Sequence, residues 1–380
     1  MKKLVLLVFA LLLVLGTIAA CAPAPTPVPT AAPPTAPPPP TKAPTAVPPT
    51  TAPTVAAAGP TAVPPTPPPA ACTKLPNMPT VAAGQLGSAD KPIVITFVPS
   101  GDVPTITKSG EETAACLKQI TGLTYQINVQ TSYAGAIEAM GGGKAQFSFL
   151  ATVSAILARQ KYGVDPVLIS SRAYQTVDLD PDKGLKGTQQ TFYKSQFITK
   201  KGSGITKIAD LKGKTFCFVE PLSASGTAFP QVVLAANGID PDNSTTGLKA
   251  YTMAGSHPNV VAAVYKGDCD AGATFLDART DATIQKTYPD VMDKVDVFYV
   301  IDVKIPNDGM QVAKGVDPVI RDATVAGFLA MMADPGGKAV VKRAYTYDAL
   351  IQVPVTYYDT MVETVKKSGI DLSKFLPPPK

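Results

Sequence analysis

The sequence contains no tryptophan and a single histidine, His257. Its five cysteines are spread along 380 residues without a compact Cys/His cluster, so the ligand spacing of a zinc site is missing. No serine, cysteine or threonine stands in a recognisable pattern with a general base, and the acidic residues do not gather as metal ligands would. These absences argue against an enzyme, and we expect neither a metal site nor a cofactor.

The excess of one sign of charge over the other is also small. Lysine and arginine number 34 against 29 aspartates and glutamates, and the formal charge of +5 is dispersed along the chain. A nucleic-acid-binding domain would gather its basic residues on one face or stripe. We therefore expect no nucleic acid partner.

A long apolar run occurs near the N-terminus, where Leu4 to Leu15 follow two lysines and small residues lead to Cys21. This pattern predicts a secretory signal peptide over residues 1–20, with an apolar core too short for a good membrane span. Thr17 to Cys21 is similar to a bacterial lipobox, whose cysteine becomes the lipidated N-terminus, although Ile18 stands where leucine is commoner. A cleaved signal followed by a chance cysteine is the alternative. We expect an extracytoplasmic protein, lipid-anchored through Cys21 to the cell membrane, in the periplasm or on the membrane's outer face.

A proline-rich segment comes next, and about half of the chain's 39 prolines lie between Ala22 and Ala70. Threonine and alanine fill most of the remainder, with Lys42 as the single charge. Such a segment has no core to bury and should form an extended spacer of polyproline type. We expect a disordered linker over residues 21–80 that holds a globular part away from the membrane.

The rest of the chain alternates between short buried strands and helices. The first group of strands and intervening helices is predicted at 93–97, 105–121, 125–129, 133–140, 145–150, 153–162 and 166–170. The second group is predicted at 215–219, 228–237, 248–251, 258–265 and 271–275. Segments 193–199 and 295–301 are predicted to cross between the groups, and helices at 317–333, 336–345 and 354–367 to close the chain.

This order predicts an α/β protein with two lobes, parallel-rich sheets and two crossing segments that form a hinge. We place the first part of lobe 1 at 81–197, lobe 2 at 198–301, and the return to lobe 1 with the C-terminal helices at 302–380. Ligands of such sheets sit outside the carboxyl ends of the strands, so the cleft between the lobes is the expected site.

Residues 220–227 contain three hydroxyl side chains and one glycine, and they connect the predicted strand 215–219 to the predicted helix 228–237. The first N–H groups of a helix have no partner within it, and this end of the helix dipole is positive. Small residues let an anion approach these amides, and serine hydroxyls add donors. The stretch therefore indicates a loop that holds a tetrahedral oxyanion, with an ordinary serine N-cap as the alternative.

With Cys21 assigned to lipid, four cysteines remain, and three pairings are possible. Export favours disulfides. Cys217 lies in the first strand of lobe 2 and Cys269 just precedes the third, and these strands are neighbours in the doubly wound order 2-1-3. We therefore predict a Cys217–Cys269 bridge, which leaves Cys72 and Cys116 to pair by elimination.

Six segments together resemble the phosphate, phosphite and phosphonate substrate-binding proteins of ABC importers, over about residues 91–355. These segments are 132–140, 193–198, 208–214, 255–257, 268–273 and 305–308, besides the hydroxyl loop. The resemblance implies a type II-like periplasmic-binding-protein clamp that captures a phosphorus oxyanion for a membrane permease.

The resemblance also implies roles for particular residues. The hydroxyl loop holds the oxyanion, which carries over to Ser223, Ser225, Gly226 and Thr227, with Ala224 where relatives often have threonine. Further ligand contacts are implied for His257, Tyr133, Tyr193, Asp277, Asp308 and, more loosely, Ser100. The two aspartates match positions that face an amine in aminoalkylphosphonate binders. They could instead accept a ligand O–H, or cap a helix at Asp277 and a turn at Asp308.

The implied partners are ABC permease subunits and the small ligand, with the protein acting as a monomer. One alternative is a ligand-sensing clamp that feeds a signalling partner. Another is a clamp for iron or a different anion, because Tyr357 and Tyr358 are the kind of phenolate pair that iron-binding relatives of this architecture use. Adjacent tyrosines in a helix point in different directions, however, which favours packing over metal binding.

Overall fold

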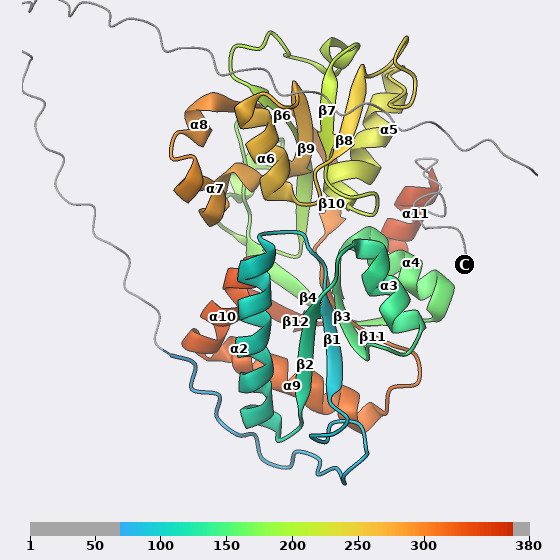
Figure 1. The fold of residues 1–380 in the computed structure, drawn as a ribbon, viewed down its shortest axis with the longest axis vertical. Coiled ribbons are helices and arrows are strands. Elements are labelled where there is room, and N and C mark those ends of the chain that lie inside the picture. The colour runs from blue at the N-terminus through green and yellow to red at the C-terminus, as the bar shows by residue number, and fades with distance from the viewer. Residues whose placement is uncertain (1–68, 368–380) are drawn as a thin grey trace, which may run out of the picture. The chain divides into compact units, whose positions relative to one another are not determined.

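The computed structural model describes residues 69–367 (Figure 1). The predicted signal peptide, Cys21 and the linker up to residue 68 lie outside the described residues, as does the C-terminal tail from residue 368. Between residues 69 and 367, none of the helices combines the length and the apolar character needed to cross a membrane.

The first sheet carries the order β12-β4-β11-β3-β1-β2, with the short β5 paired to β4. Its strands are β1 (Ile93–Phe97), β2 (Tyr125–Val129), β3 (Phe147–Leu150), β4 (Asp165–Ala173), β5 (Gln189–Gln190), β11 (Gly309–Val312) and β12 (Ala349–Gln352). β1 pairs in parallel with β2 and β3, whereas β11 runs antiparallel between β3 and β4. The sheet is therefore mixed: β3, β1 and β2 are parallel neighbours, as expected for a parallel-rich sheet, and the antiparallel β11 separates them from β4.

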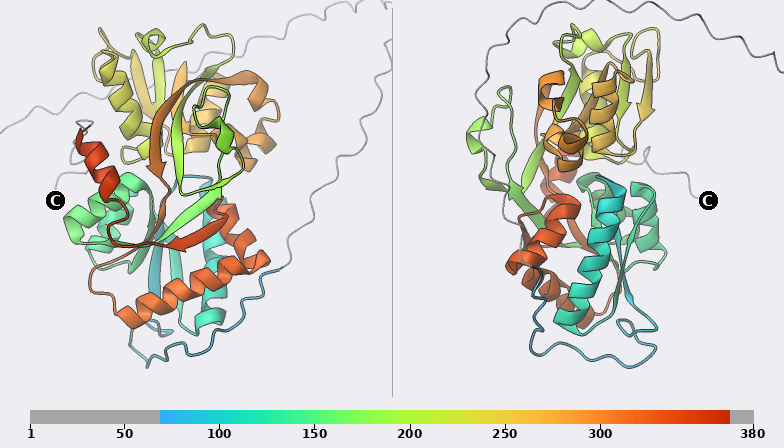
Figure 2. Two further views of the ribbon diagram at one scale, coloured as in Figure 1. Left: turned by 180° about the vertical axis from the view of Figure 1, so that it is seen from behind. Right: turned by 60° about the vertical axis from the view of Figure 1, so that its left-hand side comes forward.

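Helices cover both faces of this sheet (Figures 1 and 2). They are α2 (Val103–Thr121), α3 (Tyr133–Gly141), α4 (Thr152–Tyr162), α9 (Pro318–Ala333) and α10 (Pro335–Tyr345). Apolar side chains of α2, α9 and α10 form one core with the alternate residues Ile93, Ile95 and Phe97 of β1. The other face packs against α3 and α4 through a second core. The inner strands β1 and β3 thus bury both of their faces, as a doubly covered sheet requires.

The second sheet has the order β10-β6-β9-β7-β8. Its strands are β6 (Phe192–Lys200), β7 (Thr215–Phe218), β8 (Ala250–Met253), β9 (Ala271–Phe275) and β10 (Val295–Pro306). Its helices are α5 (Phe229–Ala236), α6 (His257–Lys266), α7 (Ala282–Thr287) and α8 (Val291–Lys294). α6, α7 and α8 share one core with Cys217 and Val219, whereas α5 packs on the opposite face of the sheet against Phe216 and Phe218 (Figure 1).

Two segments join the sheets, one leading into β6 and one leaving β10. They lie side by side, because Tyr193 pairs with Ile305 and the amide of Asn307 donates to the carbonyl of Thr191 at 2.8 Å. The Asn307 side chain donates to the carbonyls of Ser170 and Gln190 at 3.0 Å each. The chain thus crosses between the sheets twice, at residue 191 and at residues 307–308, whereas the crossings were predicted at 193–199 and 295–301. Both β6 and β10 belong to the second sheet over their full length, so by sheet membership lobe 2 covers residues 192–306.

The C-terminal part differs from the expectation. β11 and β12 were not predicted, and the helix expected at 354–367 is shorter, with α11 spanning Asp359–Lys367. Each missed strand has four residues, too few to display a period, and each is formed by pairing with strands distant in sequence.

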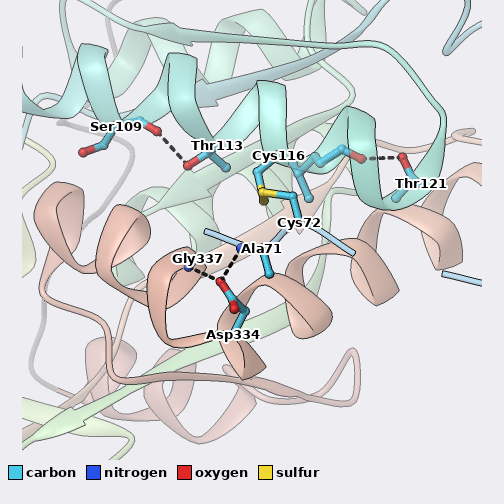
Figure 3. The surroundings of a disulfide bond; sticks show 9 residues. Ala71, Cys72, Ser109, Thr113, Cys116, Thr121, Asp334 and Gly337 are labelled. Carbon is cyan, nitrogen blue, oxygen red and sulfur yellow. Dashed lines mark hydrogen bonds between the residues drawn. A yellow bond between two sulfur atoms is a disulfide. The ribbon is translucent and has the colours of Figure 1, made fainter. Parts of the chain in front are cut away.

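Residues 71–78 are fastened to lobe 1 although the linker was expected to reach residue 80 (Figure 3). Cys72 forms a disulfide with Cys116 of α2, and the amide of Ala71 donates to the carboxylate of Asp334 at 3.1 Å. Leu75 donates to the carbonyl of Ile120 at 2.9 Å. The folded unit therefore begins earlier than predicted.

Both disulfides join the predicted partners. Cys217 of β7 pairs with Cys269, which lies just before β9, and their Cα atoms are 5.9 Å apart. β7 lies between β8 and β9 in the sheet, as the 2-1-3 order required. The Cα atoms of Cys72 and Cys116 are 5.1 Å apart.

Candidate functional site

The hydroxyl-rich turn after β7 is buried and helical. Residues Ala224–Ala228 form a π-helical turn that runs directly into α5, and Ser223 is its N-cap. The Ser223 hydroxyl accepts from the amide of Gly226 at 3.2 Å, and its carbonyl accepts from Thr227 and Ala228 at 3.1 and 3.0 Å. These amides were expected to face the ligand, but the turn itself uses them. The helix thus starts earlier than position 228, and its first N–H groups are those of Ala224 and Ser225.

Two hydroxyls of this turn have no hydrogen-bond partner within residues 69–367. Ser225 Oγ and Thr227 Oγ1 are buried, and no described residue hydrogen-bonds to either of them. The Tyr193 phenol lies next to the Ser225 hydroxyl, a contact that lowers the pKa of the phenol against the larger, opposite effect of burial. Buried polar groups left unpaired cost about 1–3 kcal/mol each, so these hydroxyls are suited to receive an external acceptor.

A cavity of about 70 Å³ lies between residues of the two lobes. One water needs roughly 10–15 Å³ of such space, so the cavity has room for a few waters or a small anion. Six of the predicted ligand residues line it: Ser100, Tyr133, Tyr193, Ser223, His257 and Asp308. Ser225, Gly226 and Thr227 belong to the turn that carries Ser223 but are not part of the cavity lining, and Asp277 is also absent from it.

His257 is the first residue of α6 and a neutral donor. Its Nδ1 accepts from the amide of Phe275 at 3.2 Å, which assigns the ring proton to Nε2, 3.5 Å from Ser223 Oγ. Burial, with the charge of Arg172, lowers the pKa of His257 to about 3. The amide of His257 donates to the carbonyl of Ser100 at 3.3 Å, a direct contact between the lobes.

This environment predicts a pH effect on stability. The pKa of His257 is about 3 in the folded protein and about 6.5 when unfolded, so the unfolded state binds the extra proton. Stability from His257 is present above pH 6.5 and falls by about 1.4 kcal/mol per pH unit below it. Between pH 6.5 and 5, the free energy of unfolding measured in urea should fall by about 2 kcal/mol more in the wild type than in His257→Gln. The chain has no second histidine to confuse the comparison, and equal losses in the two proteins would contradict the assignment.

The tyrosines of the cavity are neutral phenols. Tyr133 starts α3, whose N-cap Ser132 accepts from the amide of Gly135 at 3.0 Å, and burial raises its pKa well above the usual range. Burial and the charge of Asp308 raise the pKa of Tyr193 to about 12. Both phenols can therefore donate to an anion at physiological pH.

Arg172 and Tyr347 enter the site although the sequence analysis did not single them out. Arg172 lies near the end of β4, and its Nη2 pairs with Oδ1 of Asp308, while the Tyr347 hydroxyl donates to Oδ2. The guanidinium carbon lies 5.8 and 5.3 Å from the ring centres of Tyr193 and Tyr347. Within the described chain the buried Arg172 Nε has no partner. The one sequence signal was the position of Arg172 at the carboxyl end of a strand, where ligands of such sheets bind.

Asp277 is not brought to the cavity. It is buried and forms an ion pair with Arg279, with Oδ2 2.7 Å from Nη2, and it also accepts from Gln196 Nε2 at 2.9 Å. Its carboxylate caps the 3₁₀ turn Ala278–Thr280 through the amide of Arg279. The capping alternative therefore describes Asp277, because its charge is compensated by an arginine two residues away.

Tyr357 and Tyr358, the pair considered above as possible iron ligands, hydrogen-bond to the crossing segments instead. The Tyr357 hydroxyl donates to the carbonyl of Thr191 at 3.3 Å, and that of Tyr358 to the carbonyl of Asn307 at 3.4 Å. In the part of the chain that the structure describes, no group of three or more His, Cys, Asp or Glu residues could hold a metal ion.

Two α/β lobes, joined by paired crossing segments around a small cavity rich in hydrogen-bond donors, define a two-lobe solute-binding protein. A family model described as "ABC transporter, phosphonate, periplasmic substrate-binding protein" matches residues 95–371. This match covers well over half of the chain, and the chain belongs to that family. The family consists of transport proteins that act outside the cytoplasm, as the sequence resemblance predicted.

The individual relatives share low sequence identity with this chain. The Phosphate-import protein PhnD of Mycolicibacterium smegmatis is 26% identical over 205 residues, 53% of this chain and 59% of that protein. The chain thus matches less than two thirds of that relative's length. A binding protein component of an ABC phosphonate transporter from Pseudomonas aeruginosa has a TM-score of 0.59 at 17% identity, covering 74% of this chain and 87% of that one. PhnD1 of Prochlorococcus marinus, solved in complex with methylphosphonate, has a TM-score of 0.57 at 16% identity, covering 73% and 98%. These structures confirm the fold.

Proposed function

We propose that this protein captures a phosphorus oxyanion between its two lobes and delivers it to an ABC importer. The observation that carries the proposal is the donor set around the cavity. It combines the neutral His257 Nε2–H, the phenols of Tyr133 and Tyr193, the Ser223 hydroxyl and the Arg172 guanidinium. Donors that converge from several directions suit a tetrahedral anion, and they would leave a planar carboxylate under-coordinated.

The turn after β7 supplies the remaining donors. In this proposal Ser225 and Thr227 give their unpaired hydroxyls to the ligand, Gly226 lets the turn lie close to β7, and Ser100 adds a donor from lobe 1. Closure of the lobes brings these groups together, and the ligand is released without chemical change. The relative solved with methylphosphonate and the relative named for phosphate import support a phosphorus ligand.

The remaining parts of the proposal concern location and partners. The protein is anchored by lipid at Cys21, stands away from the membrane on the linker, acts as a monomer and docks to permease subunits. Lipidation is open to an intact-mass measurement on the membrane fraction, which should give a chain that begins at Cys21 and carries acyl groups.

Thermal unfolding with added phosphate, phosphite or methylphosphonate tests the function. A ligand at a hundred times its Kd should stabilise the fold by about 2.7 kcal/mol and raise the melting temperature. Ser225→Ala should weaken binding by roughly 5- to 100-fold, because one buried donor contributes about 1–3 kcal/mol.

Ser109→Ala is the matched control. Ser109 also carries a buried hydroxyl without a partner among the described residues, but it lies on α2 and not on the turn that carries the cavity residue Ser223. Its replacement should leave the affinity unchanged. If none of the three anions shifts the melting temperature at millimolar concentration, the proposed function is wrong.

A further inference from the structure

We infer that the cavity selects phosphorus oxyanions that carry no amine, and that Arg172 sets this selection. The inference rests on the proposed function and names the ligand class within it. A phosphonate that carries an ammonium group would need a carboxylate free to pair with it inside the cleft. Among the described residues that approach the cavity, each carboxylate already has a partner.

Asp308 lines the cavity, so it is the first carboxylate that a ligand amine could pair with. Both of its oxygens are occupied, Oδ1 by Arg172 Nη2 and Oδ2 by the Tyr347 hydroxyl. Each oxygen keeps a second lone pair, but the charge of the carboxylate is already compensated by Arg172. An ammonium group at Asp308 would therefore either lie against the guanidinium or displace it and leave it buried without a counter-ion. Breaking a buried ion pair in this way is strongly unfavourable.

Arg172 itself adds a positive charge to the same wall. Its guanidinium stays protonated at any pH relevant to proteins. It is held between the rings of Tyr193 and Tyr347, and its unpaired Nε–H offers one further hydrogen bond. An oxyanion oxygen can accept that bond, whereas an ammonium group has no lone pair to accept it and is repelled by the charge.

The other acidic groups near the site each have a partner, and none of those partners is a group that a ligand amine would replace. Asp277 is fully paired with Arg279 and Gln196, away from the cavity lining. Asp281 lines the cavity, and its Oδ1 caps α7 by accepting from the amides of Thr283 and Ile284. Glu220 faces the backbone amide of Tyr133, and burial raises the pKa of its carboxyl group.

The test compares two ligands of matched size by calorimetry. 2-Aminoethylphosphonate and propylphosphonate differ in an ammonium against a methyl group, so the pair separates charge from volume. The wild type should bind propylphosphonate at least tenfold more tightly than 2-aminoethylphosphonate, with methylphosphonate and phosphate as small reference ligands. Equal or reversed affinities of the matched pair would overturn the inference. Exclusion of both large ligands alike would also overturn it, because size and not Arg172 would then set the selection.

Variants assign the effect to Arg172. Arg172→Gln releases Asp308 and should reduce the tenfold preference to about twofold or reverse it. Arg172→Lys keeps the charge and should keep the preference. Arg172→Gln combined with Asp308→Asn removes the freed carboxylate and should cancel any gain for the amine ligand. A preference unchanged in Arg172→Gln would contradict the inference.

The outcomes also separate this inference from the proposed function. Binding of phosphate or methylphosphonate together with equal or tighter binding of 2-aminoethylphosphonate would refute the selection by Arg172 and leave the importer proposal standing. Absence of binding by every phosphorus oxyanion would refute both. Melting temperatures show whether Arg172→Gln is folded, and if it is not, the matched ligand pair on the wild type decides alone.

Discussion

Gly226→Ala is expected to reduce ligand affinity by more than 100-fold. A Cβ at this position would lie 2.3 Å from Cγ2 and 2.6 Å from Cβ of Val219, and 3.0 Å from Ser223 Oγ. Val219 is fully buried, so the surrounding core leaves its side chain no room to adopt another rotamer. The turn must then move away from the end of β7, which displaces Ser223 together with the Ser225 and Thr227 hydroxyls. Overpacking of this kind also costs about 1–3 kcal/mol of stability.

Calorimetry with the tightest ligand, followed by urea unfolding, measures both effects. Gly184→Ala is the control, because a Cβ there meets no atom within 4 Å and its φ is not in the left-handed range. The control should match the wild type in affinity and in free energy of unfolding. Ligand affinity of Gly226→Ala within tenfold of the wild type would show that the turn does not form the site.

The sequence was sufficient to predict the parts of this fold that depend on local order. Alternating strands and helices identified both lobes, and the doubly wound strand order identified the partner of Cys217. Pro258 after His257 correctly placed that histidine at a helix start, since proline suits the first helical turn.

The partners of Asp308 could not be predicted in the same way. Asp308 lies 136 residues from Arg172 and 39 from Tyr347 in the sequence. They meet because β11, which begins at Gly309, is inserted antiparallel between β3 and β4. A four-residue strand gives no periodic signal, so its pairing, and with it the arginine in the cleft, became visible only in the tertiary structure.

Asp277 is a different case, because its partner is only two residues away. A carboxylate followed at that spacing by an arginine can be neutralised locally, so the pair Asp277 and Arg279 could have been recognised from the sequence. The helical form of Ala224–Ala228 was missed for a related reason. Serine, glycine and threonine have low helix propensities, and here burial of the turn against β7 overrides them.

Removal of the Cys217–Cys269 disulfide is expected to lower the free energy of unfolding by about 4 kcal/mol. The bridge closes a loop with a sequence separation of 52 residues, and the chain-entropy relation gives that magnitude. Both cysteines are buried in the core beneath α6, so Cys217→Ala with Cys269→Ala also leaves a small void. The measurement is urea unfolding of the double variant against the wild type.

The Cys72–Cys116 disulfide provides the comparison. Its sequence separation of 44 residues gives nearly the same entropy by the same relation. Its loss should nevertheless cost less, because the segment around Ala71 and Leu75 can detach from α2 while the rest of lobe 1 stays folded.

The two bridges should also differ in their effect on binding. Cys217 lies on β7, which leads into the Ser223 turn, and Cys269 precedes β9, which carries the Phe275 amide that orients His257. Ligand affinity should therefore fall in the Cys217→Ala, Cys269→Ala protein and stay near the wild-type value in Cys72→Ala, Cys116→Ala. A loss of less than 1 kcal/mol for the first bridge, or equal affinities in the two double variants, would contradict this account.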